Sequence, residues 1–354
     1  MMRRAALATL AIALVAAACT TNSETSVPSG APTPVTITLL THDSFDVTKS
    51  VLRDFETSKG ITVKVVPTGD AGQLANRLIL ASGNPEGDVA FGVDNDQLSE
   101  LFAKDVFVPY ASTALANVAP DLILDDQHRV TPIDHGEVCV NVDLRRYLGG
   151  VPVPSSLDSL ADPAFRDQLV VENPATSTPG LAFLLATVAA YGDPGYLDYW
   201  RRLRDNGVTV VDGWEQAYFG QFSGAGGGEG THPMVVSYAT SPVAEVVFSD
   251  PPITVPPTVV LTDTCYRQIE FAGILRGTEH EAAAQQLVDF LLSQPFQEDI
   301  PLRMFVYPAS TTAKVPAVFR RNATPVTDPY QLSSDEVAAH RADWVARWSD
   351  LMGQ

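Results

Sequence analysis

Residues 173–180 read Asn-Pro-Ala-Thr-Ser-Thr-Pro-Gly, and they separate two apolar stretches. Residues 169–171, which come just before, predict the end of a buried strand. Residues 181–191, which follow, are longer and predict a helix. The chain around this short segment is therefore expected to form a strand, a connection and a helix, as in an α/β fold.

The start of this helix has the composition of a binding site for a polar group. Thr178 is a natural N-cap, and Pro179 suits the first helical position, where its missing N–H costs nothing. The free backbone N–H groups, the hydroxyls of Thr176 and Ser177 and the helix dipole favour an anionic or strongly hydrogen-bonding ligand group. An ordinary capped helix without a ligand is the alternative for this stretch.

Two further motifs lie downstream. Residues 213–218 read Gly-Trp-Glu-Gln-Ala-Tyr and place Trp214 and Tyr218 four positions apart, on one face of a helix. Residues 234–242 read Met-Val-Val-Ser-Tyr-Ala-Thr-Ser-Pro, which is the pattern of a strand that runs into a helix start. Aromatic rings of this kind can line a cleft for a flat or cationic ligand, and burial in an ordinary core is the alternative.

The amino-terminal part of the chain alternates strands and helices. Strands are expected at 36–41, 61–66 and 88–91, and helices at 44–59 and 71–82. This order predicts a parallel sheet with helices on its faces. Ligands of such sheets bind beyond the carboxyl ends of the strands.

Polar side chains stand at these strand ends. His42, Asp43 and Ser44 follow the first strand, Asp70 follows the second, and Asp94 follows the third. A carboxylate there could balance a ligand cation or accept a hydrogen bond from an amino group. An N-cap role is the alternative for Asp43 and Asp94, because each precedes a predicted helix.

The chain resembles the thiamine-binding proteins of bacterial ABC importers, within the wider class of two-lobed periplasmic binding proteins. The segments that carry the resemblance follow the family's order over nearly the whole mature chain: Asp43-Ser44-Phe45, Gly92-Val93-Asp94-Asn95, Thr176-Ser177-Thr178-Pro179-Gly180, Gly213-Trp214 with Ala217-Tyr218, Ser237-Tyr238 with Thr240-Ser241-Pro242, and Tyr307-Pro308. The resemblance implies a monomer that captures thiamine or a thiamine phosphate and delivers it to an ABC permease. It implies neither an enzyme nor a cofactor.

The same resemblance implies an α/β fold of type II-like architecture. Each lobe would be a mainly parallel sheet flanked by helices, and two crossover strands would form the hinge. Lobe 1 would comprise residues 35–137 and 262–354, and lobe 2 would comprise residues 138–261. The hinge is expected near 137–142 and 262–268. Further elements are expected at 138–142, 169–172, 208–211, 234–238 and 267–275 as strands, and at 281–292 and 335–351 as helices.

The family motifs and the strand ends together define the predicted ligand site. In the family, the positions that match Trp214 and Tyr238 contact the ligand, and thiamine offers a cationic thiazolium ring and a flat aminopyrimidine ring to aromatic faces. This chain has His42 and Phe305 where the family often has Tyr and Trp, which reduces the stacking surface. The predicted ligand-binding residues are His42, Asp43, Ser44, Asp70, Asp94, Ser177, Thr178, Gly180, Trp214, Tyr218, Tyr238, Ser241 and Phe305.

The cysteines separate the transport function from an enzymatic alternative. Cys139 and Cys265 lie on the two crossover strands, which are neighbours in this class of fold, and an exported chain favours a disulfide between them. Thiaminase I shares the architecture and uses a cysteine nucleophile, and a bridge would exclude Cys139 from that role. A binding protein for another cargo such as ferric iron is the third possibility, although the motifs around Trp214 and Ser177 do not supply clustered Tyr, His and carboxylate.

The first 34 residues have the pattern of a lipoprotein leader. Residues 1–18 have a basic start and an apolar core that is too short to span a bilayer comfortably, and the run before Cys19 resembles a lipobox. We expect cleavage before Cys19, a lipid on its thiol, and a flexible tether at 19–34, so that the folded part is anchored outside the cytoplasmic membrane. A plain secretory signal with a chance cysteine is the alternative.

The composition narrows the classes of partner. The formal net charge is −19, which argues against nucleic acid and is compatible with a cationic ligand. The six histidines lack the spacing of metal ligands, so no metal site is predicted. The glycine run at 224–230 follows a predicted helix and precedes a strand, which is the wrong order for a phosphate-binding loop, so we expect a surface loop there.

Overall fold

The computed structural model describes residues 35–150, 152–225 and 230–354. The predicted signal peptide, Cys19 with its lipid, the tether, and residues 226–229 of the glycine run lie outside the described part. The described residues belong to one compact unit. Within the described residues, none of the helices has the length and apolar character needed to cross a membrane.

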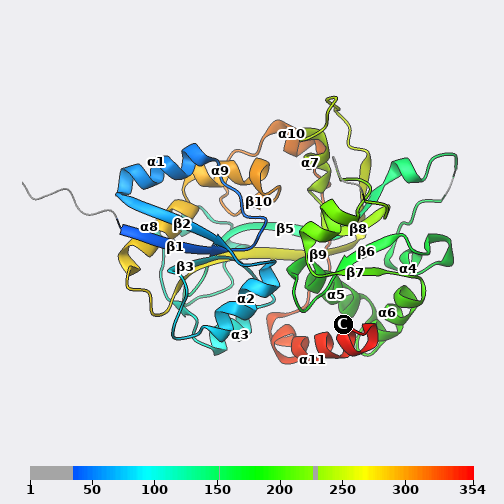
Figure 1. Cartoon of the computed structure of the whole chain (residues 1–354), viewed down its shortest axis with the longest axis horizontal. Helices are drawn as coiled ribbons and strands as arrows, with labels where there is room; N and C mark the ends of the chain where they lie inside the picture. The colour runs from blue at the N-terminus through cyan, green and yellow to red at the C-terminus, as the bar shows by residue number, and fades with distance from the viewer. Residues whose placement is uncertain (1–34, 151, 226–229) are drawn as a thin grey trace, which may run out of the picture. The chain divides into compact units, whose positions relative to one another are not determined.

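A mixed sheet forms the centre of this unit (Figure 1). Its main strand order is β2-β1-β3-β9-β5-β8-β6-β7, with β10 beside β5 and β4 beside β9. The pairs within β2-β1-β3 and within β8-β6-β7 are parallel, whereas β9 and β5 run antiparallel to their neighbours. The strands are β1 (Val35–Thr41), β2 (Ile61–Pro67), β3 (Val89–Asp94), β4 (Phe107–Val108), β5 (Thr131–Asp143), β6 (Leu169–Glu172), β7 (Thr209–Val211), β8 (Met234–Tyr238), β9 (Thr258–Leu275) and β10 (Tyr307–Pro308).

Helices flank the sheet, and the expected ones other than α1 form close to their predicted bounds. They are α1 (Lys49–Lys59), α2 (Ala71–Leu80), α3 (Leu98–Ala103), α4 (Leu157–Leu160), α5 (Thr178–Tyr191), α6 (Gly195–Asp205), α7 (Ser241–Val247), α8 (Glu281–Leu291), α9 (Gln294–Arg303), α10 (Ala317–Asn322) and α11 (Ser334–Met352). Shorter 3₁₀ turns are η1 (Thr113–Asn117), η2 (Pro120–Leu122), η3 (Leu144–Arg146) and η4 (Pro163–Phe165), and η5 (Gln216–Gln221) is a π-helical turn.

Helix α1 starts later than its sequence pattern predicts, at Lys49 instead of residue 44. The reason is a contact with a distant helix: Asp299 of α9 accepts the Thr48 N–H at 2.6 Å and the Thr48 hydroxyl at 2.7 Å. A carboxylate at this place satisfies a helix-start N–H group and favours the positive end of the dipole. Residues 42–48 therefore form a loop before the helix.

The two ends of the sheet carry separate hydrophobic cores. The β1-β3 end packs its apolar side chains with those of α2 and α8, as Leu39, Leu74 and Leu287 do. The β6-β8 end packs around α5, whose residues from Thr178 to Val188 are all buried. A helix that is apolar on every side is the kind that fills a core, which is how residues 181–188 behave. The expected two-lobed fold is confirmed in this arrangement.

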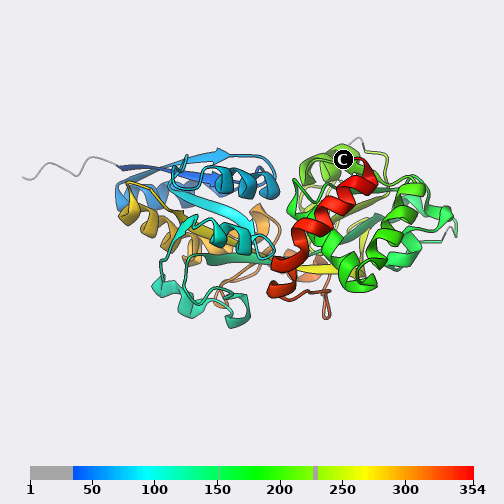
Figure 2. The same ribbon diagram turned by 90° about the horizontal axis from the view of Figure 1, so that it is seen from below.

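The closing helix α11 belongs to the second of these cores. Val337, Trp344 and Trp348 pack there beside Trp200 of α6, with ring centroids of Trp200 and Trp348 5.4 Å apart. Figure 2 shows α11 lying across the helices of that end. Its packing differs from the sequence-based assignment of residues 262–354 to lobe 1, because the periodicity of a helix identifies its apolar face but not the surface that covers it.

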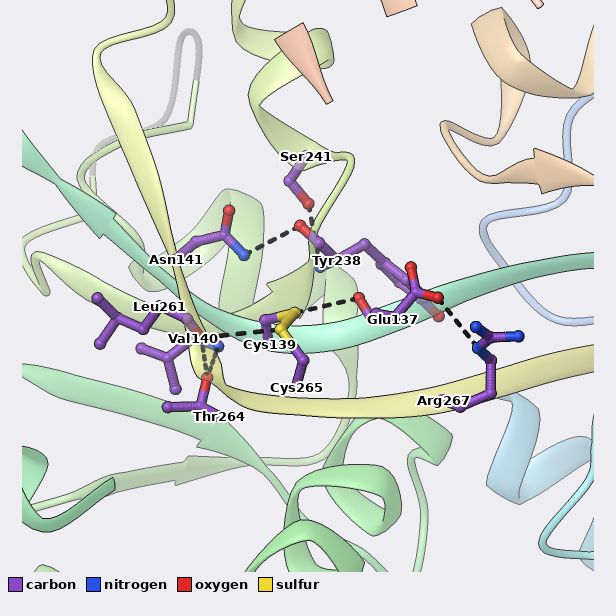
Figure 3. The surroundings of a disulfide bond; sticks show 10 residues. All are labelled: Glu137, Cys139, Val140, Asn141, Tyr238, Ser241, Leu261, Thr264, Cys265 and Arg267. Atoms are coloured by element: carbon purple, nitrogen blue, oxygen red, sulfur yellow. Dashed lines mark hydrogen bonds and ion pairs between the residues drawn. A yellow bond between two sulfur atoms is a disulfide. The ribbon is translucent and has the colours of Figure 1, made fainter. Parts of the chain in front are cut away.

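The two crossover strands, β5 and β9, pair along most of their length. Both strands are longer than predicted from their apolar patterns, which covered 138–142 and 267–275. They continue through polar residues, such as Asp134 and Thr264, that are buried in the sheet. Cys139 and Cys265 form a disulfide between them, as expected (Figure 3). Beside it, the Thr264 hydroxyl accepts the Val140 N–H at 2.8 Å, where the register of the two strands shifts.

Candidate ligand-binding site

A cavity of about 660 Å³ lies between side chains from both ends of the sheet. One side comes from the loop after β1, the start of α2, Glu270 of β9 and residues 303–306. The other comes from the start of α5, residues 212–219, β8 and α7. The size suits a small molecule. The predicted residues that line it are His42, Asp43, Ser44, Asp70, Thr178, Trp214, Tyr218, Tyr238, Ser241 and Phe305.

Four rings of this cavity form an aromatic wall: Trp214, Tyr218, Phe219 and Tyr238. Trp214 stacks on Tyr218 with ring centroids 5.0 Å apart and an interplanar angle of 16°. Tyr238 meets Trp214 edge-on at 6.3 Å, and Phe219 does so at 5.5 Å. The four-residue spacing of Trp214 and Tyr218 places them on one face as expected, although the turn that carries Tyr218 is π-helical.

Hydrogen bonds fix the orientation of the wall. The Trp214 indole N–H donates to the Ser237 hydroxyl at 2.9 Å, and Ser237 shares a hydrogen bond of 2.8 Å with Ser241. The Tyr218 hydroxyl donates to Glu245, a buried carboxyl group that also lines the cavity. Burial raises the pKa of Glu245 to about 7. The wall is therefore held rigidly before any ligand arrives, which lowers the entropy cost of binding.

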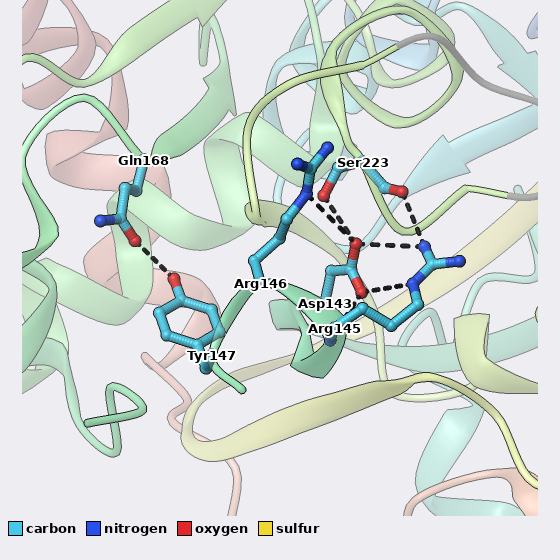
Figure 4. Close-up of polar contacts among 6 residues, drawn as sticks. All are labelled: Asp143, Arg145, Arg146, Tyr147, Gln168 and Ser223. Atoms are coloured by element: carbon cyan, nitrogen blue, oxygen red, sulfur yellow. Dashed lines mark hydrogen bonds and ion pairs between the residues drawn. The ribbon is translucent and has the colours of Figure 1, made fainter. Parts of the chain in front are cut away.

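A polar cluster joins Ser223, which lies two residues after the π-helical turn, to the end of β5 (Figure 4). Ser223 donates to Asp143 at 2.7 Å, and its backbone carbonyl accepts from Arg145 at 2.8 Å. Burial alone would raise the pKa of Asp143, but hydrogen bonds from Arg145 and Ser223 hold it below its usual value. Tyr147 donates to Gln168 at 2.6 Å in the same region. The contacts of Ser223 with Asp143 and Arg145 anchor the chain just after the π-helical turn.

Two ionisable groups of the cavity face each other beside β3. His42 Nε2 lies 3.7 Å from a Glu270 carboxylate oxygen, and both side chains are buried. Burial alone would lower the pKa of His42, but Glu270, Asp70 and Asp43 raise it above its usual value. Gly92 makes room for the ring, because a Cβ there would lie 2.2 Å from His42. The acidic partners therefore favour the cationic form of His42 over a neutral stacking ring.

Asp70 links the two sides of the cavity. Its carboxylate accepts the Thr178 N–H at 3.2 Å and the Trp214 N–H at 2.9 Å. Thr178 is the first residue of α5 and Ser177 is the N-cap, which corrects the expectation that Thr178 caps the helix. The positive end of α5, predicted to hold an anionic ligand group, thus holds a carboxylate of the protein itself.

Three predicted site residues lie outside the cavity lining. Asp94 is fully buried, and one of its oxygens accepts the Asp96 N–H at 3.1 Å. Ser177 is also fully buried. Gly180 packs against β6, where a Cβ would lie 2.5 Å from the Glu172 carbonyl oxygen. Gly180 therefore serves the close contact of helix and strand, and a direct ligand contact for these three residues remains a prediction.

The structure adds cavity residues that the sequence reasoning missed, chiefly Glu245, Glu270, Phe219 and Arg303. Glu270 had a signal, because it is a lone charged side chain between Ile269 and Phe271 in a predicted strand. A charge in such a place is costly to bury unless it has a partner or a ligand. Glu245 and Arg303 carry no such signal in the sequence, because they reach the cavity only through the way α7 and α9 pack in the fold. In the described ranges, no three His, Cys, Asp or Glu side chains are placed to hold a metal ion.

Comparisons with known proteins agree with this geometry. The thiamine-binding periplasmic protein of Brucella suis biovar 1 (strain 1330) is 30% identical, with 88% of this chain and 91% of the relative covered. That of Escherichia coli (strain K12) is 29% identical, with 88% and 92% covered. A solved periplasmic thiamin binding protein matches with a TM-score of 0.79 and 27% identity, over 93% of this chain and 99% of that one.

More distant structures share the fold alone. The ferric binding protein from Campylobacter jejuni is 15% identical with a TM-score of 0.69, covering 89% of this chain and 99% of its own. A family model described as bacterial extracellular solute-binding protein matches residues 87–328, which is most of the described chain. With its two-lobed fold, its lined cavity and its thiamine-binding relatives, the chain belongs to the family of bacterial extracellular solute-binding proteins.

Proposed function

We propose that this protein captures thiamine outside the cytoplasmic membrane and delivers it to an ABC importer. The observation that carries the proposal is one cavity lined both by the aromatic wall and by several carboxyl groups. Thiamine combines a flat cationic thiazolium ring with a flat aminopyrimidine ring, so it needs both kinds of surface. The relatives that bear the name thiamine-binding periplasmic protein support the same ligand.

The charge of the lining favours a cation. Six carboxyl side chains line the cavity, against the basic side chain of Arg303 and the acid-paired His42: Asp43, Asp70, Asp212, Glu215, Glu245 and Glu270. A cation over an aromatic face gains about 0.5–2 kcal/mol, and stacked rings add about 0.5–1.5 kcal/mol beyond the area they bury. The thiazolium ring would therefore lie on the aromatic wall within reach of these carboxylates.

Delivery would use the two crossover strands as a hinge. β5 and β9 are the strands that connect the two cores, so a change in their twist would open or close the cavity. The hinge would lie at 137–142 and 262–268, next to the disulfide. A permease would then recognise the closed form of a monomer that a lipid on Cys19 keeps at the membrane surface. In this proposal two bodies move: residues 35–137 with the part of 262–354 that precedes α11, and residues 138–261 together with α11.

The bonded state of the cysteines argues against a thiaminase-like activity. Cys139 is fully buried and bonded to Cys265, so neither sulfur is available as a thiolate nucleophile. Within the described residues these are the two cysteines present. The relatives are named as binding proteins, which also favours transport over catalysis.

Ligand retention tests the proposal. Native mass spectrometry of protein purified from cells is expected to show a retained mass of thiamine or of a thiamine phosphate. Added thiamine is expected to raise the melting temperature of ligand-free protein, because a ligand that binds the native state alone stabilises it by mass action. No thermal shift with thiamine or its phosphates at millimolar concentration would contradict the proposal.

A further inference from the structure

Three carboxyl groups lie side by side across three adjacent strands next to the cavity. Glu270 of β9 is in register with Asp94 of β3 on one side and with Asp134 of β5 on the other. Asp94 and Asp134 are fully buried, whereas Glu270 is 8% exposed and lines the cavity. His42 reaches the same place from the loop after β1. Of the four groups, Glu270 and His42 alone can touch a ligand.

The hydrogen-bonding environment shows which of these groups is ionised. Neither carboxyl oxygen of Asp134 receives an N–H or hydroxyl donor from the described residues, so a charge on Asp134 would be buried without a partner. Burial and the neighbouring Glu270 raise the pKa of Asp134 well above its usual value, so Asp134 keeps its proton. Burial would raise the pKa of Glu270, but His42 and Asp134 lower it.

The other ionisable neighbours do not change this assignment. Burial raises the pKa of Asp94 well above its usual range, with contributions from Asp96 and Glu270, so Asp94 is neutral too. Burial likewise keeps the Tyr238 hydroxyl protonated. Asp70 and Asp43, from the start of α2 and the loop after β1, add negative charge around His42. At a pH below the raised pKa of His42, the empty cavity therefore presents Glu270 as a carboxylate whose partner is the His42 imidazolium.

We propose that Glu270 is the counter-ion that selects a cationic solute, and that His42 releases its proton to solvent when the cation binds. The inference rests on the proposed function and adds the group that recognises the charge. Two cations beside one carboxylate repel each other strongly in a site with little water. The charge of a thiazolium ring is permanent, whereas the His42 charge can leave as a proton, and burial alone already favours the neutral imidazole.

The proposed exchange of the His42 proton for the ligand cation makes the binding affinity depend on pH. The protein binds a proton on His42 before the ligand enters and loses it afterwards, so the affinity for the cation rises with pH. The rise is about tenfold per pH unit below the pKa of His42 in the free protein, and it levels off above that pKa. A ligand without a positive charge leaves the His42–Glu270 pair intact and shows no such rise.

Calorimetry on the unmodified protein tests the exchange directly. Thiamine is titrated between about pH 6 and about pH 8.5 in pairs of buffers that differ in ionisation enthalpy, which reports the number of protons released. We expect a release that approaches one proton at the lower pH values, together with tighter binding as the pH rises. Tight binding with no proton release at any of these pH values would overturn the inference and leave the thiamine function standing.

Substitutions of His42 and Glu270, with His280 as a control, test which residues cause the proton release and the charge recognition. His42→Gln is expected to bind thiamine with a weaker pH dependence and to release about one proton fewer at the lower pH values. His280→Gln, at an exposed position at the start of α8, is expected to match the unmodified protein. Glu270→Gln is expected to weaken thiamine binding by about tenfold or more, because a charge-assisted contact is lost. An unchanged proton release in folded His42→Gln would contradict the role of His42, and no thiamine binding at any pH would overturn the proposed function together with this inference.

Discussion

Trp214 is the side chain whose contacts most clearly prepare it for a ligand. Its ring is stacked on Tyr218 and fixed by the hydrogen bond to Ser237, so one face is packed and the ring still lines the cavity. We predict that Trp214→Ala weakens thiamine binding by about 2 kcal/mol or more, as the loss of a central aromatic contact does. Trp214→Phe, which keeps a ring but not the N–H donor, is expected to fall between the two proteins. Titration calorimetry measures both effects.

Fluorescence supplies the control for this variant. The three other tryptophans, Trp200, Trp344 and Trp348, are buried in the core of the β6-β8 end. Any quenching of tryptophan emission by thiamine should therefore come from Trp214 and should disappear in Trp214→Phe. Leu80→Ala, at a side chain that is 88% exposed, is the neutral surface control. An unchanged dissociation constant in folded Trp214→Ala would return this ring to a purely structural role.

At the scale of elements, Asp70 joins the start of α2 to the start of α5 and to the aromatic wall. Its charged oxygens accept two backbone N–H groups, from Thr178 and Trp214, and hydrogen bonds to a charged group are each worth about 1.5–3 kcal/mol. Asn at this position keeps one acceptor oxygen and no charge. We predict that Asp70→Asn weakens thiamine binding by about tenfold or more, because the closed form of the cavity loses its link.

Asp212→Asn is the matched control for Asp70. Asp212 is exposed and lines the same cavity, so this change removes an equal charge without removing the contacts to Thr178 and Trp214. Equal losses of affinity in the two variants would show that Asp70 acts through its charge alone. Small-angle scattering should also show a more open population for Asp70→Asn with saturating thiamine, and not for Asp212→Asn.

The disulfide is the second prediction at this scale. Cys139 and Cys265 are 126 residues apart in the chain, and a bridge that closes so long a loop restricts the unfolded state strongly. The chain-entropy estimate is about 4–5 kcal/mol as an upper figure. We predict that Cys139→Ser with Cys265→Ser loses up to this free energy of unfolding and still binds thiamine, because neither residue lines the cavity.

Thiol counting checks the bridge itself. In the unfolded, unreduced chain that lacks Cys19, no thiol is expected to react. If the thiols of Cys139 and Cys265 both react there, the bridge is absent in solution and the thiaminase alternative reopens. Denaturant titration of the double variant gives the stability difference in the same preparation.

For the whole molecule, the sequence predicted the parts that follow from local patterns. The strand at 36–41 and the helix at 281–292 formed with nearly the same bounds, because their apolar periodicity already defines a buried face. The disulfide followed from the family's neighbouring crossover strands. The predicted start of α1 was wrong by several residues. The contact that accompanies the observed start, from the Thr48 N–H to Asp299, involves a residue that is distant in the chain.

In the candidate site, too, the sequence predicted the residues that belong to local motifs but not the residues that pack against them. Motifs placed Trp214, Tyr218 and Tyr238 in one cavity, because each motif lies at a predictable strand or helix end. The partners that give the cavity its chemistry, Glu270 and Glu245, come from elements packed against those motifs. Asp70 lines the cavity as expected, but its oxygens contact backbone N–H groups, which no local pattern could reveal.

The central claim is that one thiamine cation binds in the cavity between the two cores. Titration of ligand-free protein with thiamine at about pH 8, where the proposed proton exchange favours binding more than at lower pH, measures this most directly. The account predicts saturable binding with one site per chain, weakened by about 2 kcal/mol or more in Trp214→Ala and nearly unchanged in Leu80→Ala. Absence of saturable binding by the folded, unmodified protein, or binding of equal strength in Trp214→Ala, would contradict it.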